Sequence, residues 1–347
     1  MKKSPLISII VPVYNSEEYL ERTFDTVINQ DFDDYELILV NDGSTDNSPI
    51  ICQRYAEKYN RVHYYTKENG GLCSARNYGL TKASGQYIMF MDNDDEYCQE
   101  TLKTVAEAIV EYKTEIIRFN RKRIQIFDDG TEKIDIFGTK GIAESVPVKF
   151  NRDDFFGNYK LVRKSGCFAG IWNAAFKRDL FNTIQFDEDV TAGGEDLILN
   201  IQLYDIFKDI VFLPDVLYLY YRRTRHSIST TFQVNQIYAL GKAASHERNL
   251  VKKNSLSDNE FFSHVHIYLA SIVKVLTHKN SNLSITDKFR ILDSLCQDYY
   301  GFQFTSEEVK HSTISFINKA YLYFYTNRHY IFLFQITRLI MKIRGNA

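Results

Sequence analysis

Four carboxylates stand within five residues in the segment Asp92-Asn93-Asp94-Asp95-Glu96. They directly follow the apolar run Met89-Phe90-Met91, so the charges begin where a buried strand is expected to end. Carboxylates this close repel one another unless a cation lies among them or they point into solvent. Asp92 and Asp94 project to the same side of an extended chain, and such a pair can hold a hard divalent cation together with phosphate oxygens. The alternative is an acidic helix start, where negative charge favours the helix dipole.

Two earlier loops carry residues that suit a nucleotide. Asp42 lies in the polar loop Val40 to Asp46, and an acidic residue at a strand end can accept hydrogen bonds from a nucleobase or a ribose. The same loop residues also suit a simple helix cap. Gly70 and Gly71 precede a helix with Arg76 in its first turns, so backbone N–H groups and a guanidinium there suit a diphosphate. A glycine turn with a surface arginine is the alternative.

Two later segments also carry reactive side chains. Glu195 and Asp196 precede an amphipathic helix, and a carboxylate at the mouth of a site can take a proton from an attacking hydroxyl. The alternative is an N-terminal cap and dipole partner. The segment Tyr220 to Ser227 collects cations beside hydroxyls, which suits either a loop folded over a diphosphate or a solvated basic loop.

The elements that would position these residues alternate between strands and helices. Leu6 to Val13 is a nearly continuous apolar run, typical of a strand covered on both faces. Asn15 with Glu18 predicts a capped helix that ends at about Gln30. The alternation continues with strands at Glu36 to Val40, Val62 to Tyr65 and Tyr87 to Met91, and helices at Ile50 to Tyr59, Ser74 to Ala83 and Thr101 to Tyr112. This order predicts a doubly wound α/β sheet, whose ligands lie beyond the carboxyl ends of the strands.

The later part of the chain is expected to change character. A strand is predicted near Ile116 to Phe119, followed by a hairpin from Ile124 to Phe137 that turns at Asp129 and Gly130. Helices dominate beyond Asn151, with a short strand pair around Ile210 to Tyr220. From about Phe232 onward the pattern is almost entirely helical, with a polar break at Asn280 to Thr286.

Composition excludes some classes of protein. With 347 residues, 44% of them hydrophobic, the chain has room for a full core and a second module. A formal charge of −2 argues against nucleic acid as the main partner. The five cysteines are far apart and predict reduced thiols in a cytosolic protein. Neither an export signal nor an apolar stretch of about 18 residues is evident, so a cytoplasmic location is expected.

The C-terminal end is basic and aromatic. No Asp or Glu follows Glu308, whereas Lys310, Lys319, Arg328 and Arg338 do, interleaved with Phe and Tyr. This composition suits contact with an anionic membrane surface at the inner face of the cell membrane, where a lipid-linked acceptor would also lie. An ordinary helical subdomain or a homo-oligomer interface with buried aromatics is the alternative.

Taken together and in this order, the segments resemble family 2 glycosyltransferases with the GT-A fold, of the bacterial capsule, exopolysaccharide and teichoic acid type. The resemblance spans about residues 5 to 230. The matching segments are Val11-Pro12-Val13-Tyr14-Asn15, Val40 to Asp46, Gly70 to Asn77, Asp92-Asn93-Asp94-Asp95, Trp172-Asn173 with Lys177-Arg178, and Glu195-Asp196.

The resemblance implies a GT-A domain over residues 1–230, with the nucleotide sugar bound by about residues 1–120 and the acceptor by about 121–230. A helical C-terminal domain would follow over 231–347. The implied reaction is inverting transfer of a sugar from a nucleoside diphosphate, UDP by family habit, to a hydroxyl of a saccharide or lipid-linked saccharide in cell-surface polysaccharide synthesis. Mn or Mg is the implied cofactor.

The resemblance also implies roles for single residues. Asp196 would be the catalytic base, with Glu195 beside it in acceptor binding. Asp92 and Asp94 would be the metal-binding DxD pair, with Asp94 preferred as the direct ligand. Trp172 would face the acceptor sugar, although a buried core tryptophan fits the sequence equally well. The residues that would contact the nucleotide sugar are Pro12, Tyr14, Asn15, Asp42, Gly71, Arg76, Asp92, Asn93, Arg222 and His226.

The sequence differs from the family pattern at one position, and two alternative functions have to be compared with glycosyl transfer. Ala174 stands where the family often carries Lys, so a lysine contact with the acceptor is not expected at this position. A sugar nucleotidyltransferase would need a glycine-rich loop after the first strand, where this chain has Pro12 to Asn15. A noncatalytic sugar or nucleotide binder is the other rival, and the intact Asp92, Asp94 and Asp196 argue against it.

Overall fold

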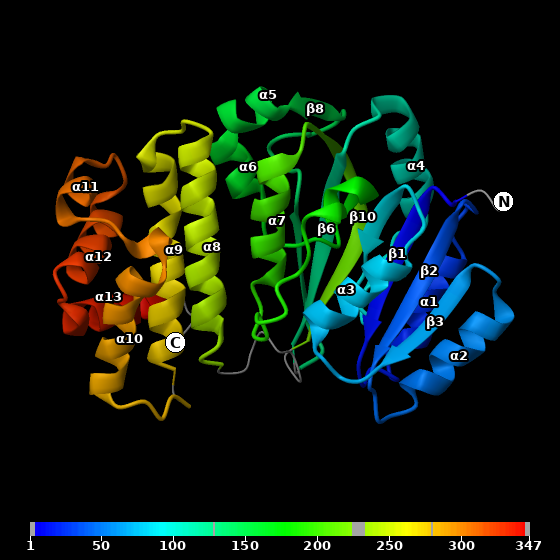
Figure 1. Ribbon diagram of the computed structural model, residues 1–347, viewed down its shortest axis with the longest axis horizontal. Coiled ribbons are helices and arrows are strands. Elements are labelled where there is room, and N and C mark those ends of the chain that lie inside the picture. The colour runs from blue at the N-terminus through cyan, green and yellow to red at the C-terminus, as the bar shows by residue number, and fades with distance from the viewer. Residues whose placement is uncertain (1–3, 128, 224–232, 279, 344–347) are drawn as a thin grey trace. The chain divides into compact units, whose positions relative to one another are not determined.

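The computed structural model describes residues 4–127, 129–223, 233–278 and 280–343. The chain divides into two compact units. The first comprises Met1–Thr191 with Glu195–Ser227, and the second comprises Ala192–Gly194 with Ile228–Ala347. Figure 1 shows the sheet of the first unit and the helices of the second.

The first unit is built on one mixed sheet with the strand order β3-β2-β1-β4-β9-β6-β10-β5. The strands are β1 Ile7–Val13, β2 Tyr35–Asp42, β3 Val62–Lys67, β4 Tyr87–Phe90, β5 Glu96–Tyr97, β6 Ile116–Ile126, β7 Glu132–Phe137, β8 Val148–Asn151, β9 Ala174–Lys177 and β10 Asp209–Arg223. Strands β3, β2, β1 and β4 are mutually parallel, and β6 is parallel to β10. Strand β9 is antiparallel to both β4 and β6 and joins the two parallel groups. The predicted mostly parallel α/β sheet is confirmed.

Helices connect and flank these strands in the first unit. They are α1 Leu20–Ile28, α2 Ser48–Lys58, α3 Leu72–Lys82, α4 Thr101–Tyr112, α5 Arg152–Gly157, α6 Tyr159–Ser165 and α7 Glu195–Ile206, with a 3₁₀ helix at Arg178–Asn182. All residues of β1 are buried, as expected for a strand covered on both faces. Helix α3 packs on β1 and β2, and Gly79 lets it approach closely, since a Cβ there would lie 2.5 Å from Ile10 Cγ2.

Three local predictions were wrong. Asn15 does not cap a helix: α1 begins at Leu20, and Asn15 has a left-handed φ of 44°. Its Oδ1 instead accepts a hydrogen bond from the Thr45 N–H at 2.8 Å, which ties the loop after β1 to the loop after β2. Strand β6 continues through Ile126 without the predicted interruption. The segment near residue 210 is one long strand, β10, because Pro214 lies at a register shift against β6 and is tolerated there.

The second unit consists of helices among its described residues. They are α8 Gln236–Lys253, α9 Asp258–Leu276, α10 Ile285–Asp298, a 3₁₀ turn Tyr300–Phe302, α11 Ser306–His311, α12 Phe316–Thr326 and α13 Tyr330–Ile343. Side chains of Ser257, Ser284, Thr305 and Ser315 cap α9, α10, α11 and α12. The predicted polar break, Asn280 to Thr286, covers the described residues before α10 and the first two residues of that helix. Among the described residues, no helix combines the length and the hydropathy that crossing a membrane requires.

Replacing Gly79 with alanine is expected to destabilise the first unit by about 1–3 kcal/mol, because the added methyl overpacks the α3–β1 contact. Gly157→Ala, in α5, is the matched control, since a Cβ there meets nothing within 4 Å. Urea unfolding followed by circular dichroism compares the two variants. Equal midpoints for both variants would contradict the close approach of α3 to β1.

Candidate active site

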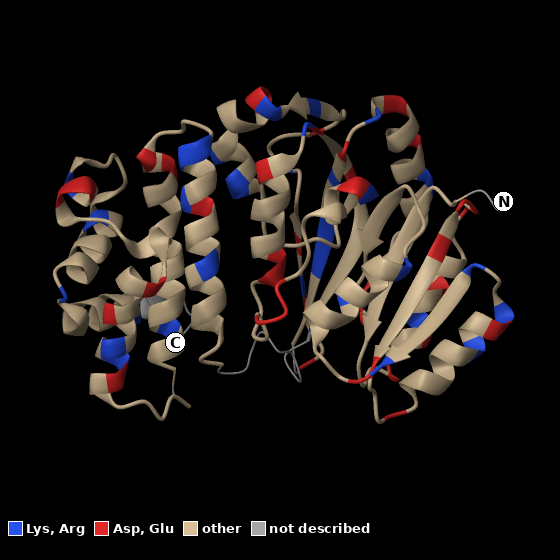
Figure 2. Cartoon of the chain, in the orientation of Figure 1, with Lys and Arg blue, Asp and Glu red and all other residues tan. Residues whose placement is uncertain are grey.

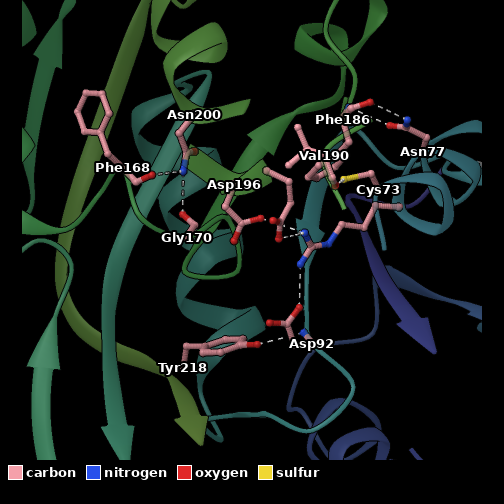
Figure 3. A network of polar contacts seen from close by, with 12 residues as sticks. Cys73, Asn77, Asp92, Phe168, Gly170, Phe186, Val190, Asp196, Asn200 and Tyr218 are labelled. Atoms are coloured by element: carbon pink, nitrogen blue, oxygen red, sulfur yellow. Dashed lines mark hydrogen bonds and ion pairs between the residues drawn. The ribbon is translucent and has the colours of Figure 1, made fainter. Parts of the chain in front are cut away.

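Three carboxylates from distant parts of the sequence converge on the side chain of Arg76 (Figure 3). Its Nη1 donates to Asp196 Oδ1 at 2.9 Å and to Glu195 Oε1 at 3.2 Å. Its Nη2 donates to Asp92 Oδ1 at 2.9 Å. Arg76 is 1% exposed, so these contacts form away from bulk water, where ion pairs are strong. The loop after β4 and the start of α7 are thereby joined through α3.

The same helix also positions the segment that leads to α7. Asn77 Nδ2 donates to the Phe186 carbonyl at 2.9 Å, and the Phe186 N–H donates back to Asn77 Oδ1 at 2.9 Å. One turn earlier, the Cys73 thiol lies 3.4 Å from the Val190 carbonyl. Three residues of α3, namely Cys73, Arg76 and Asn77, therefore contact the chain between Phe186 and Asp196.

Asp196 has the electrostatic setting of a general base. Burial raises the pKa of its carboxyl to about 7, and the charges of Glu195 and Asp92 act in the same direction. Arg76 and the Ile171 backbone oppose this rise of the pKa because they stabilise the carboxylate. A carboxyl that gains and loses its proton near neutral pH suits proton transfer from a hydroxyl.

The four carboxylates after β4 have different surroundings. Asp95 is fully buried: its Oδ2 accepts from the Tyr218 hydroxyl at 2.8 Å, and its Oδ1 accepts from the Tyr221 N–H at 2.9 Å. Burial, together with Asp94 and Asp92, raises the pKa of Asp95 well above its usual range. Glu96 pairs with Arg22 at 2.5 Å. Asp95 and Glu96 therefore fasten the loop to its neighbours.

Asp92 and Asp94 remain half-buried in this loop, as does Asn93 between them. The Tyr218 hydroxyl also accepts a hydrogen bond from the Asp92 N–H at 3.1 Å, so β10 supports the loop. Within the described residues, no three His, Cys, Asp or Glu side chains gather as a preassembled metal site. Mg²⁺ commonly uses only one or two protein carboxylates and takes its other oxygens from substrate phosphates and water. The Asp92 and Asp94 pair fits a cation of that kind.

Asp42 organises the glycine loop. Its Oδ1 accepts from the Gly70 N–H at 3.0 Å and from Lys67 Nζ at 2.8 Å, and its Oδ2 accepts from the Gly71 N–H at 2.8 Å. Gly71, the residue directly before α3, has a φ of 86°, a conformation that favours glycine. The carboxylate thus draws the N-terminus of α3 toward the end of β2. The predicted nucleobase contact of Asp42 stays a prediction.

The other predicted nucleotide residues lie at the ends of β1 and β10. Pro12 is buried in β1, whereas Tyr14 is 51% exposed just beyond it. Arg222 is half-buried in β10, at the level of Gln125 in β6. His226 lies outside the described residues.

Trp172 is buried, with 7% of its surface exposed. Its ring stacks on Tyr218 and Tyr220, with centroids 5.1 Å away in each case. Ala174, the first residue of β9, is fully buried, so the position at which relatives carry Lys offers no polar side chain here. This packing agrees with the alternative that Trp172 is a buried core residue. The predicted contact of Trp172 with the acceptor sugar stays a prediction.

Sequence reasoning missed a polar network on β6. Arg118 is fully buried, donates from Nη1 to the Gly170 carbonyl at 2.6 Å and bonds through Nη2 to Asn200 Oδ1. Asn200 in α7 donates to the Phe168 and Gly170 carbonyls at 3.0 and 3.1 Å (Figure 3). Basic residues are visible along β6 in Figure 2. The sequence signal was Arg118-Phe119-Asn120-Arg121-Lys122-Arg123, four cations within one strand.

Comparisons with known proteins agree on a family. Residues 8–184 match glycosyl transferase family 2. Glycosyltransferase GlyA of Streptococcus pneumoniae serotype 4 is 35% identical over 71% of this chain and 34% of GlyA. Glycosyltransferase GlyG of the same organism is 30% identical over 67% of this chain and 76% of GlyG. The minor teichoic acid biosynthesis protein GgaB of Bacillus subtilis is 35% identical over 56% of this chain and 20% of GgaB. The chain thus spans about a third of GlyA and a fifth of GgaB.

Solved structures show the same fold. TarS of S. aureus in complex with UDP-GlcNAc has a TM-score of 0.69 and 19% identity, over 98% of this chain and 92% of that one. The mannosyltransferase PcManGT of Pyrobaculum calidifontis in complex with GDP-Man and Mn2+ has a TM-score of 0.52 and 16% identity, over 96% and 88%. The predicted GT-A fold with a helical C-terminal region is confirmed. Because the family match covers more than half of the chain and reaches from β1 to β9, the protein belongs to glycosyl transferase family 2.

Proposed function

We propose that this chain is an inverting glycosyltransferase that moves a sugar from a UDP-sugar to a hydroxyl of a saccharide or lipid-linked saccharide in cell-surface polysaccharide synthesis. The proposal rests mainly on one observation: the buried Arg76 forms hydrogen bonds with both Asp196 and Asp92. A candidate base and a candidate donor-binding carboxylate are thereby held by the two amino groups of one guanidinium. The UDP-GlcNAc bound by TarS and the teichoic acid role of GgaB support the choice of donor and product class.

In the proposed reaction, Asp196 accepts the proton of the acceptor hydroxyl. The acceptor oxygen forms a bond to the anomeric carbon as the bond from that carbon to the diphosphate oxygen breaks. The nucleoside diphosphate leaves with the bonding electron pair, and attack from the opposite face inverts the anomeric centre. Burial of Asp196 raises its proton affinity, and Arg76 keeps it oriented.

A divalent cation is part of the proposal. Asp94 and Asp92 would hold it together with oxygens of the donor diphosphate, and PcManGT, a protein of the same fold, is known with Mn2+. When bound, the cation neutralises charge on the departing diphosphate.

Asp196→Asn is expected to lower kcat of sugar transfer by at least about a hundredfold, because an amide cannot accept the proton. Binding of UDP, measured by calorimetry, should persist, since the amide keeps the shape of the original side chain. Asp189→Asn is the matched control, because Asp189 is exposed near the same segment. Donor turnover is measured across UDP, GDP and dTDP sugars with Mn, Mg or EDTA. Unaltered turnover in Asp196→Asn would show that Asp196 is not the base. Absence of both nucleotide binding and turnover in the wild type would contradict the glycosyltransferase proposal and favour a noncatalytic protein.

The pH dependence of kcat/KM should follow the protonation of the Asp196 carboxyl. Activity is expected to rise with pH through about 7 and then level off, because the base must lose its proton first. Glu195→Gln is expected to move this rise to lower pH, because the charge of Glu195 raises the pKa of Asp196. That variant leaves Arg76, Asp92 and Ile171, the other groups that act on the pKa of Asp196, unsubstituted. An identical pH profile in wild type and Glu195→Gln would contradict the assignment.

We also infer that the second unit carries a surface for anionic lipid, near which a lipid-linked acceptor would lie. Its apolar part consists of Phe316, Ile317, Tyr323, Ile331, Phe332 and Leu339, which are all at least 48% exposed on α12 and α13. No acidic residue follows Glu308 in the sequence, so cations dominate the charge of this segment. Exposed aromatics beside cations favour an anionic bilayer surface.

Phe316→Ser combined with Phe332→Ser is expected to weaken sedimentation with phosphatidylserine-containing vesicles by about tenfold or more. Point changes are preferable to truncation, because Leu322 and Leu333 of the same helices are buried in the unit. Ile267→Ser on α9, where Ile267 is 51% exposed, is the matched control. Equal sedimentation of all three proteins, or equal binding to neutral vesicles, would contradict a lipid surface and favour an oligomer contact.

A further inference from the structure

Arg121 is a buried cation that has no anionic partner among the described residues. Only 8% of it is exposed, and its Nη1 donates to Asn173 Oδ1 at a long 3.5 Å. In the part of the chain that the structure describes, no carboxylate forms an ion pair with it. Its guanidinium lies instead over the rings of Trp172 and Phe137, at 4.6 and 5.6 Å from their centroids. Desolvation lowers the pKa of Arg121 to about 10; Arg118 and Arg123 act in the same direction, whereas Cys167 and Tyr220 act against this lowering.

Three nearby arginines, of which Arg76 and Arg118 are buried and Arg123 is partly exposed, have oxygen partners at short distance. Arg76 has three carboxylates, Arg118 has a carbonyl and an amide oxygen, and Arg123 has Asp135 at 2.6 Å. A charge taken out of water is costly unless a partner compensates for it. Cation–π contact with two rings compensates only part of that cost. Among the residues that the structure describes, none supplies the anion that would offset the charge of Arg121, so an anionic group of a bound ligand would supply it.

The position of Arg121 connects it to the reacting groups. The backbone of Ile171 contacts Asp196, and the next two residues, Trp172 and Asn173, contact Arg121. Trp172 also stacks on Tyr218, whose hydroxyl meets the Asp92 N–H. A tripeptide thus links the candidate base to the buried cation. Arg121 lies on β6, in the half of the sheet away from the glycine loop and Asp42.

We propose that Arg121 binds an anionic group, a phosphate or a carboxylate, carried by the acceptor close to the hydroxyl that reacts. The inference rests on the proposed function and deepens it by naming the class of acceptor. A planar guanidinium matches both oxyanions with paired N–H donors, and an anion in this place completes the missing ion pair. The acceptor is accordingly a phosphodiester-linked polyol or a uronic-acid-containing saccharide rather than a neutral one.

The chain offers a direct probe, because Trp172 is its only tryptophan and lies against Arg121. Full-length protein is titrated with glycerol phosphate, with glucuronate and with neutral glucose at constant ionic strength, while tryptophan fluorescence is recorded. We expect a saturable change with glycerol phosphate or glucuronate and none with glucose. The anion with the lower Kd distinguishes a phosphate subsite from a carboxylate subsite.

Arg121→Met is expected to weaken anion binding by about tenfold or more, since a charge-assisted contact is lost. Its apo thermal midpoint should equal or exceed that of wild type, because an uncompensated buried charge is removed. Arg123→Gln is the matched control, a change of the neighbouring cation that already has Asp135, and it should keep the fluorescence response.

An equal anion response in Arg121→Met and wild type, or no saturable response to either anion, would overturn the proposal. UDP binding by calorimetry separates this failure from that of the proposed function. Protein that binds UDP but no acceptor-like anion refutes only the Arg121 subsite. Protein that binds anion but no UDP refutes the glycosyltransferase proposal instead.

Discussion

The contact of Arg76 with Asp92, Glu195 and Asp196 holds together three segments that no strand pairing joins directly. A guanidinium that is 1% exposed would be strongly unfavourable alone, and three clustered carboxylates would repel one another without it. Each charge therefore makes the burial of the others tolerable. Removing one member of such a buried group typically costs about 3–5 kcal/mol, because the remaining charge stays buried without its partner. The position of α7 and the loop after β4 depend on this balance.

The same contact sets the chemistry of Asp196. Burial alone would push the pKa of this carboxyl far upward, and the carboxylates Glu195 and Asp92 add to the rise. Arg76 limits that rise to a value of about 7. The contact with Arg76 thus both positions the Asp196 carboxyl and limits its proton affinity.

The parallel half of the sheet was predictable because its signals are local. Apolar runs that end just before Asn41 and Asp92 predict strand ends within a few residues, and α4 has the predicted bounds, Thr101–Tyr112. The side-chain partners of Arg76 were not predictable from the sequence, because they lie 16, 119 and 120 residues away along the chain. Residue types showed that Asp196 and Arg76 could do chemistry, but not that they touch. The prediction for Asn15 was wrong because an asparagine side chain can either cap a helix or accept a hydrogen bond from another loop. Here Thr45, in the loop after β2, donates that hydrogen bond.

The other half of the sheet resists such prediction for a physical reason. Strand β9 is four residues long and too short for a clear periodicity, and it exists because β4 and β6 both pair with it. Arg118 and Arg121 look like surface charges in the sequence, yet both are buried, one by the Asn200 and Gly170 oxygens and the other by aromatic rings. Local motifs thus build the side proposed for the donor, whereas long-range polar contacts build the side proposed for the acceptor. Under the proposed function, enzymes that use the same kind of donor would keep the local motifs. The acceptor that each enzyme binds would then depend on a few long-range contacts, such as those of Arg121.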